Sequence, residues 1–347
     1  CNTNVSKLYK IAKKFNVKKI GFNEKSLRNI KKTNFRSLKT FSDCSTFHDM
    51  ISSKTDVIIY AISGLQSLDL LIRLLKTGKK IGIANKECII SLGYNFNKLS
   101  KKYNTEIIPL DSEHNSIYHL LKQNLGNFKS ITLTASGGPF FNFNKKQLNK
   151  VSVEQAVKHP IWNMGKKISI DSATLMNKAL EIIEAKYLFN LDDNQLNAVI
   201  HPQAIIHALI NYENGVSTAI LNNPDMRIPI SSLFFKYNKY SKFNKTFDIT
   251  KQSKLEFFPI DEIKFPALRL AFQVMKMGGL APHIFNYLNE KLVHLFMEKK
   301  IKFVDIVKLN ETNLEKIFSK NSNISKPNLS DMKIINYWID NNIYIGN

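Results

Sequence analysis

The sequence predicts an α/β protein built from an N-terminal Rossmann-like parallel sheet, a central α+β domain and a C-terminal helical bundle. Three observations predict this fold class. Strand and helix patterns alternate over residues 1–111, mixed strands and helices follow over 112–235, and only helical periodicity occurs over 259–347. A connection rich in Lys, Asn and Phe occupies 236–258. A chain of 347 residues is also too long for one ordinary core, which favours several domains.

In the N-terminal part, helical periodicity and short buried apolar runs follow one another along the chain. Helices are predicted over 5–15, 27–33 (a short helix or a loop), 64–78 and 87–103, and strands over 18–22, 56–63, 79–85 and 105–110. Gly78 is expected to end the third helix, because glycine readily adopts the left-handed conformation found after helices. The alternation is typical of a parallel, doubly wound sheet.

The central part begins with a strand over 130–135 that runs into a Gly-Gly-Pro turn. A polar helix is predicted over 144–160, the strongest helical pattern covers 168–189, and strands around an Asn-Gly hairpin turn are predicted over 197–223. The C-terminal part shows three amphipathic helices, as expected for a small helical bundle, over 265–279, 284–300 and 305–320.

The net charge of +22, from 50 basic and 28 acidic residues, has two explanations. The lysines are scattered among Asn, Ile and Phe, as in a chain from an AT-rich genome, and no Arg-rich cluster or RNA-binding signature accompanies them. We therefore expect no nucleic-acid partner, with a basic nucleic-acid binder as the alternative. A basic surface would still attract a small phosphorylated substrate.

Membrane and disulfide signals are missing from the sequence. It contains no apolar run of about 18 residues and no signal-peptide pattern, so we expect no membrane partner. Cys1, Cys44 and Cys88 share no metal-binding or disulfide spacing, which fits a reduced protein. A bacterial cytoplasm is the predicted location, with a plastid-type organelle as the alternative.

Two acidic residues, Asp111 and Glu113, follow the strand over 105–110. In extended backbone their side chains would point the same way, at the strand end where open α/β sheets bind ligands. They would then hold a divalent cation or share a proton. The alternative is a helix N-terminus, with Asp111 or Ser112 as the cap.

Within the pattern over 168–189, the helix is expected to run over 171–188, with Asp171 or Ser172 as its N-cap, and it carries a second polar group. Asn177, Lys178 and Glu181 would share one face. An amide, an ammonium and a carboxylate together suit a polyhydroxylated phosphate, and Glu181 is a candidate third cation ligand. A solvated face with a Lys–Glu pair is the alternative.

Two loops add weaker signals. Ser136 precedes two glycines, whose backbone can approach an anion closely, although an ordinary turn explains the same letters. His159 and Trp162 lie in a loop bounded by Pro160 and Gly165, where a large aromatic residue serves as a plug or as a lid over substrate.

The first domain carries no GxGxxG motif. Gly64 follows the strand over 56–63, at a position that suits a nucleotide crevice. Asn85 and Glu87 follow the next strand, whose end should face a nucleotide in the same way.

Six motifs occur in order and at suitable spacing, and together they resemble the 1-deoxy-D-xylulose 5-phosphate reductoisomerase family. They are IANKE, PLDSEHNSI, TASGGPF, HPIWNMGKKISIDSATLMNKALEIIEA, HPQAIIH and PDMRIPI. The likeness runs from the first residues to the last helices and is dense over 81–230. It implies an NADPH-dependent oxidoreductase and isomerase of the non-mevalonate isoprenoid pathway, with its catalytic domain at 112–235. Such an enzyme rearranges 1-deoxy-D-xylulose 5-phosphate and reduces the product to 2-C-methyl-D-erythritol 4-phosphate.

The resemblance also implies cofactors, partners and residue roles. The expected cation is Mg²⁺ or Mn²⁺, with Co²⁺ as a further alternative, and a homodimer is expected. Metal ligands are implied at Asp111, Glu113 and Glu181, which with Lys178 would be the catalytic residues. Substrate contacts are implied for Ser112, Ser136, His159, Trp162, Ser172, Asn177 and Lys178. Cofactor contacts are implied for Gly64, Asn85, Glu87, Gly165, Asn2 and Asn4. His207 would pack near the metal.

The chain departs from the family pattern in three places. The family's first strand and GxTGxxG turn are missing before Cys1, so we expect a truncated record, with impaired NADPH binding if the chain begins here. A non-catalytic sugar-phosphate and metal-binding remnant is therefore the alternative function. Cys88 replaces a usual Ser, and Tyr287 and Leu288 replace small residues, which predicts repacking of the C-terminal bundle.

Overall fold

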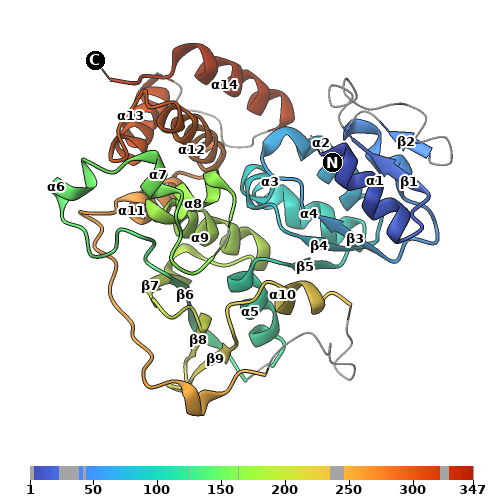
Figure 1. Cartoon of the computed structure of the whole chain (residues 1–347), viewed down its shortest axis with the longest axis horizontal. Helices are drawn as coiled ribbons and strands as arrows, with labels where there is room; N and C mark the ends of the chain where they lie inside the picture. The colour runs from blue at the N-terminus through green and yellow to red at the C-terminus, as the bar shows by residue number, and fades with distance from the viewer. Residues whose placement is uncertain are drawn as a thin grey trace. The chain divides into compact units, whose positions relative to one another are not determined.

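The computed structural model describes residues 4–22, 39–41, 44–123, 125–162, 164–234, 246–320 and 328–346. The chain forms two compact units, one of Cys1–Cys88 with Lys98–Ile107 and one of Ile89–Asn97 with Ile108–Asn347 (Figure 1). The helix predicted over 27–33 lies outside the described residues. The domain boundaries proposed from the sequence stay predictions.

The first unit has the parallel strands that the sequence predicts. Its strands are β1 (Lys19–Gly21), β2 (Lys39–Phe41), β3 (Val57–Tyr60) and β4 (Lys80–Ile83), and β5 (Ile107–Pro109) begins at its edge. β1 pairs with β2 and β3 with β4, both in parallel, and β4 lies between β3 and β5. The α/β class with a Rossmann-like parallel sheet is therefore confirmed.

The helices of the first unit follow from its apolar spacing. They are α1 (Val5–Lys14), the 3₁₀ segments η3 (Cys44–Met50) and η4 (Leu65–Ser67), and α2 (Leu68–Leu75). α2 ends at Leu75 with Lys76 as its C-cap residue, so the prediction that Gly78 ends this helix is wrong, although Gly78 does adopt a φ of +66°. The helix predicted over 87–103 is divided between α3 (Lys86–Leu92) and α4 (Tyr94–Lys102), because Gly93 turns the chain at a φ of +54°.

The second unit is built on a four-stranded mixed sheet in the order β7-β6-β8-β9. The strands are β6 (Phe128–Ala135), β7 (Leu196–Ile200), β8 (Ile206–Tyr212) and β9 (Ser217–Leu221). β6 runs parallel to β7 and antiparallel to β8, and β8 and β9 form the predicted hairpin. Gly215 adopts a φ of +85°, which the hairpin turn needs and which glycine adopts without strain.

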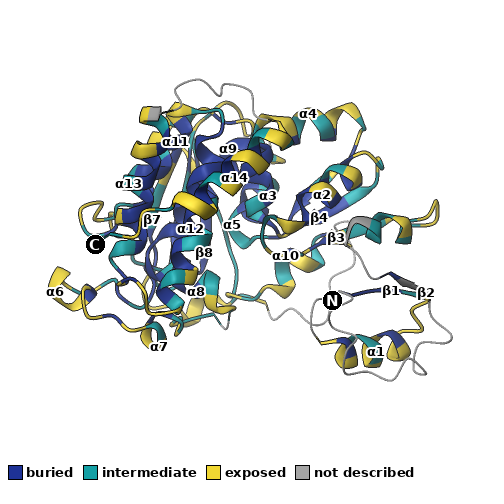
Figure 2. Cartoon of the chain, turned by 90° about the horizontal axis from the view of Figure 1, so that it is seen from above, coloured by how far each residue is buried: buried dark blue, intermediate teal, exposed yellow. Residues whose placement is uncertain are grey.

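Two helices connect this sheet to the candidate site. α5 (Ser112–Leu121) packs on β8 and β9, and α9 (Met176–Phe189) packs on β6 and β7. Nearly every residue of α9 is buried, whereas α6 is largely exposed (Figure 2). The alternative of a solvated Lys–Glu face on α9 is therefore wrong.

The helix predicted over 168–189 is two helices, α8 (Lys166–Ala173) and α9. The chain breaks at Leu175, whose φ is +58°. Asp171 and Ser172 therefore lie inside α8, and the prediction that one of them caps α9 is wrong. Thr174 explains the break: its hydroxyl donates to carbonyls of the preceding turn and accepts from the Met176 backbone N–H.

The polar helix predicted over 144–160 is likewise two single-turn helices, α6 (Lys145–Leu148) and α7 (Val153–Ala156). Each begins with its own capping box. Asn144 pairs with Gln147 in the first, and Ser152 pairs with Gln155 in the second. Because each capping box starts a helix of its own, residues 144–160 form two short helices instead of one.

The C-terminal helices form the predicted bundle. They are α11 (Ala267–Met277), α12 (Ala281–Met297), α13 (Asp305–Lys320) and α14 (Leu329–Asn342), and short segments before them are η5 (Asp193–Gln195), α10 (Arg227–Ser231) and η6 (Ile249–Lys251). α12 contacts α8, α11, α13 and α14. Leu288 is fully buried, and the Tyr287 hydroxyl donates to Asp340 on α14. Over the described residues, no helix combines the length and apolarity that crossing a bilayer requires.

Candidate metal and substrate site

Three carboxylates from two helices converge in the second unit. Asp111 is the N-cap residue of α5, Glu113 lies in its first turn, and Glu181 lies on α9. One oxygen of each lies within 4.8 Å of the others. The helix start expected as the alternative is thus present, and the premise of extended backbone past Asp111 is wrong. However, the Asp111 side chain makes no capping bond, so the helix start and the carboxylate cluster coexist.

Lys178 lies among these carboxylates. Its Nζ donates to Glu113 Oε1 at 2.8 Å and to Glu181 Oε2, while Asn177 donates to the other oxygen of Glu181. Burial alone would lower the pKa of Lys178, but the Glu113 and Glu181 carboxylates outweigh it and the pKa is raised. The ammonium therefore stays charged at neutral pH. Ser112 completes the group by donating to Glu113 Oε2 at 2.7 Å.

The donor set fits a hard divalent cation. One ammonium offsets only one of the three negative charges, and Glu181 is 1% exposed, so water screens the remainder poorly. Carboxylate oxygens are the ligands that Mg²⁺ and Mn²⁺ prefer. His207, buried on β8, adds no positive charge at neutral pH, because burial and then the nearby charge of Lys178 lower its pKa to about 4.

Ser136 and His159 form a second polar group. His159 Nδ1 accepts from the backbone N–H groups of Ile161 at 3.1 Å and Trp162 at 2.9 Å. Its Nε2 therefore carries the proton and donates to Ser136 Oγ at 3.0 Å. Ser136 Oγ also accepts from the Gly138 N–H at 3.3 Å, so two donors point at this oxygen. Burial lowers the pKa of His159, which favours this neutral form.

The glycine turn brings Ser136 close to α8. Gly137 and Gly138 have φ values of +85° and +65°, and a Cβ on Gly138 would lie 2.8 Å from the Ser172 carbonyl oxygen. The backbone of the turn therefore packs directly on the end of α8. Ser136 and Ser172, which sequence analysis assigned to one substrate group, accordingly lie on segments in contact.

α8 is also fixed from the C-terminal bundle. Asp171 is buried, and its two oxygens accept from Asn289 Nδ2 on α12 and from Lys167 Nζ, each at 2.8 Å. Asn289 lies in the segment where Tyr287 and Leu288 depart from the family pattern. The hydrogen bond of Asn289 to Asp171 therefore joins the C-terminal bundle to α8.

The remaining expected substrate residue, Trp162, is half-buried beside His159. Gly165 is exposed and is the N-cap residue of α8, with open space around a Cβ built on it. The substrate role of Trp162 and the cofactor role of Gly165 stay predictions.

In the first unit, Asn85 joins the loops that follow β3 and β4. Its Nδ2 donates to the carbonyls of Ile62 and Gly64, and its Oδ1 accepts from the Cys88 N–H. The Asn85 side chain therefore holds the two strand-end loops together. Glu87 lies in the first turn of α3.

The two expected cofactor residues at the start of the chain have different outcomes. Asn4 is the N-cap of α1 and accepts from the Lys7 N–H at 2.9 Å, a structural role that sequence analysis did not assign. Asn2 lies outside the described residues.

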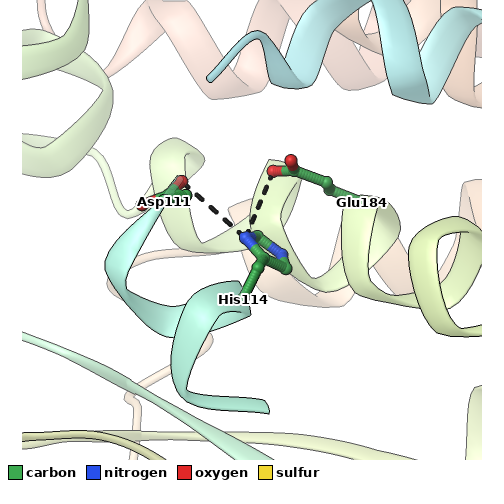
Figure 3. Close-up of side chains that lie close together, drawn as sticks. All are labelled: Asp111, His114 and Glu184. Atoms are coloured by element: carbon green, nitrogen blue, oxygen red, sulfur yellow. Dashed lines mark ion pairs between the residues drawn. The ribbon is translucent and has the colours of Figure 1, made fainter. Parts of the chain in front are cut away.

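Sequence analysis left His114 without a role and did not single out Glu184. Both are buried, and with Asp111 they form a second group of possible ligand atoms (Figure 3). The signal for Glu184 was its spacing, since it lies one turn after Glu181 on α9 and faces the same side.

Comparison with known proteins explains this combination of sites. The sequence model of 1-deoxy-D-xylulose 5-phosphate reductoisomerase matches residues 1–93. The model of its C-terminal domain matches 107–189, and that of the DXP reductoisomerase C-terminal domain matches 221–340. The enzyme of Wolbachia pipientis is 41% identical over 285 residues, which cover 81% of this chain and 73% of the relative. The chain belongs to the 1-deoxy-D-xylulose 5-phosphate reductoisomerase family. It is therefore an enzyme of the reductoisomerase class, as the resemblance predicted.

Other reductoisomerases agree. The enzyme of Chlamydia caviae is 40% identical over 257 residues, covering 74% of this chain and 68% of the relative. The reductoisomerase of Zymomonas mobilis, solved in complex with NADPH, matches with a TM-score of 0.87 and 33% identity over 97% of this chain and 88% of that chain. A reductoisomerase solved with NADPH, fosmidomycin and magnesium matches with a TM-score of 0.89 and 30% identity, covering 98% and 88%.

Proposed function

We propose that the chain converts 1-deoxy-D-xylulose 5-phosphate to 2-C-methyl-D-erythritol 4-phosphate, with NADPH as the reductant. The cation is Mg²⁺ or Mn²⁺, and Co²⁺ is a further alternative. Family membership supports the reaction. The observation that carries the assignment to this chain is the convergence of Asp111, Glu113 and Glu181 around Lys178. The related structures with bound NADPH and magnesium support the cofactors. The proposal includes a homodimer, as the resemblance implies.

Asp111, Glu113 and Glu181 would hold the cation. A divalent cation bound there supplies electrostatic stabilisation of negative charge on the substrate oxygens. Lys178 and Asn177 hold the Glu181 carboxylate in place. Because Lys178 stays charged, it would also attract an anionic substrate.

Ser136, His159 and Ser172 would bind the phosphate. Since two donors point at Ser136 Oγ, its own O–H is oriented away from both and can donate to a phosphate oxygen. Trp162 would cover the bound substrate, because its backbone is fixed to His159.

The first unit would bind NADPH. In open α/β sheets ligands bind at the carboxyl ends of the strands, where Asn85 joins the loops after β3 and β4. Gly64 has a φ of +78° at the start of η4, which lets the backbone turn sharply there. Gly64 and Glu87 would line the cofactor.

The direct test is NADPH oxidation by the chain with 1-deoxy-D-xylulose 5-phosphate and Mn²⁺. We expect Glu181→Gln to lower kcat by about 100-fold or more, because it removes a charged ligand from a buried site. Glu311→Gln is the matched control, since Glu311 forms an ion pair with Arg269 in the C-terminal bundle. Oxidation that continues unchanged in Glu181→Gln would refute the assignment.

A further inference from the structure

Glu184 is a buried carboxylate that the proposed function does not use. Its side chain is 3% exposed, and it lies on α9 one turn after Glu181. Burying a carboxylate is costly unless a charged or hydrogen-bonding group compensates it. One group that faces Glu184 is the ring of His114.

His114 contacts α9 at two points. Its ring is fully buried, with Nε2 2.9 Å from the Glu181 carbonyl oxygen and Nδ1 3.5 Å from Glu184 Oε2. A carbonyl can only accept, so Nε2 donates to it and Nδ1 is the atom that faces the carboxylate. Figure 3 shows Nδ1 between Glu184 and Asp111, whose Oδ2 lies 3.8 Å away.

The two contacts of the His114 ring with α9 matter because His114 lies next to two of the carboxylates in the chain. His114 directly follows Glu113 and is three residues after Asp111, so its ring links the start of α5 to α9. These two helices supply the three carboxylates. The ring of Phe189, also on α9, stacks on His114 with centroids 6.4 Å apart and planes at 22°. Residues of α9 therefore contact the ring at both of its nitrogens and on one face.

We propose that Glu184 is a positioning residue for the cation site: through His114 it holds the Asp111–Glu113 segment against α9. This inference rests on the proposed function, because it assigns Glu184 a purpose at that site. Residues behind metal ligands commonly orient them in this way, through a histidine or carboxylate that does not itself touch the metal.

Asp111, His114 and Glu184 could also hold a cation themselves, since their ligand atoms lie within 4.8 Å of one another. The positioning role is favoured because Asp111 belongs to both groups and the Nε2 atom of His114 is committed to the Glu181 backbone. The number of cations bound per chain distinguishes the two.

The test measures Mn²⁺ binding by calorimetric titration and by electron paramagnetic resonance, with no substrate present. We expect the unmodified chain to bind one Mn²⁺, and Glu184→Gln to bind one Mn²⁺ about 10- to 100-fold more weakly. Glu311→Gln, which also removes one carboxylate charge, should bind as the unmodified chain does. Leu292→Ala controls for lost stability, because Leu292 is fully buried in α12.

A double variant tests the path through His114. If Glu184 acts through the ring, His114→Gln combined with Glu184→Gln should weaken Mn²⁺ binding no more than the worse single variant. Additive losses would overturn the proposal, as would unchanged affinity in Glu184→Gln while the unmodified chain binds Mn²⁺. Two cations per chain, one lost in Glu184→Gln, would replace it with a second cation site. No Mn²⁺ binding by the unmodified chain would instead remove the proposed function itself.

Discussion

Ser136 illustrates how one residue acquires a function from its neighbours. The sequence offered only a serine before two glycines. In the structure its oxygen accepts from His159 Nε2 and from the Gly138 N–H, which directs its own proton elsewhere. The backbone N–H groups that bind His159 Nδ1 determine this direction, because they decide which ring nitrogen carries the proton.

Replacement of Ser136 by Ala should weaken binding of a phosphonate substrate mimic by roughly 10-fold, since a hydrogen bond to a charged group is lost. Calorimetric titration in the presence of Mn²⁺ measures this. Ser130→Ala is the matched control, because Ser130 lies on β6, the strand that leads to Ser136, and accepts from Asn211 instead. Equal affinities of Ser136→Ala and the control would show that Ser136 does not contact the phosphate.

Some residues of the site could be predicted from the sequence and others could not. The three acids could be grouped because each lies beside a recognisable element end or helix face. The pairing of His114 with Glu184 could not, because it depends on how α5 lies against α9, which no local pattern encodes. The role of Asn4 could not be decided from the sequence, because an Asn before a helix can cap the helix or contact a ligand.

At the scale of elements, helix boundaries were harder to predict than helices. The apolar spacing over 168–189 is continuous across Leu175, so periodicity alone cannot reveal the break. The break matters because it places Ser172 and Lys178 on two separate helices, α8 and α9, instead of on one continuous helix. Over 144–160 the capping boxes of Asn144 with Gln147 and of Ser152 with Gln155 decide where each helix starts, and helical periodicity carries no information about them.

His283 on α12 makes the bundle sensitive to pH. It is 2% exposed, with Nδ1 2.9 Å from Ser91 Oγ and Nε2 2.8 Å from Asn336 Oδ1, so it joins α3, α12 and α14. Burial lowers its pKa to about 4, although its bond to Asn336 opposes this. The folded chain therefore binds this proton less readily than the unfolded chain does.

Because the unfolded chain binds the His283 proton more readily, acid destabilises the folded chain. The stabilisation by neutral His283 is fully present above its unfolded pKa of about 6.5 and is lost as the pH falls toward 4, by about 3 kcal/mol in total. We expect His283→Gln to lose less thermal stability than the unmodified chain between about pH 7 and about pH 4. Scanning calorimetry measures both. Parallel losses in the two proteins would contradict the assignment.

At the scale of the whole molecule, the net charge of +22 should act on encounter rather than on fold. Raising ionic strength from about 50 to about 500 mM should slow association of the phosphorylated substrate by roughly 10-fold and leave kcat nearly unchanged. Stopped-flow fluorescence of Trp162 and Trp338 can follow binding. An association rate that ignores salt would mean that the charge does not steer the substrate.

The broad organisation was the most predictable part of the molecule. Alternating patterns predicted the parallel strands, and one Asn-Gly pair predicted the β8–β9 hairpin, because both depend on local sequence. The order of the mixed sheet depends on pairings between distant strands, β6 with β7 and β8, and local sequence does not determine these.

Gly138 and Gly165 differ in how strictly the fold requires glycine. Gly165 is the N-cap residue of α8, and Gly138 packs against the last residues of that helix. Gly165 has an ordinary φ of −65°, and among the described residues no atom beyond its chain neighbours lies within 4 Å of a Cβ built on it, so the fold of this segment does not by itself require glycine there. At Gly138 a methyl group would meet the backbone of Ser172, which cannot swing aside as a side chain does. The glycine turn and the end of α8 can therefore diverge only together, as one inherited unit.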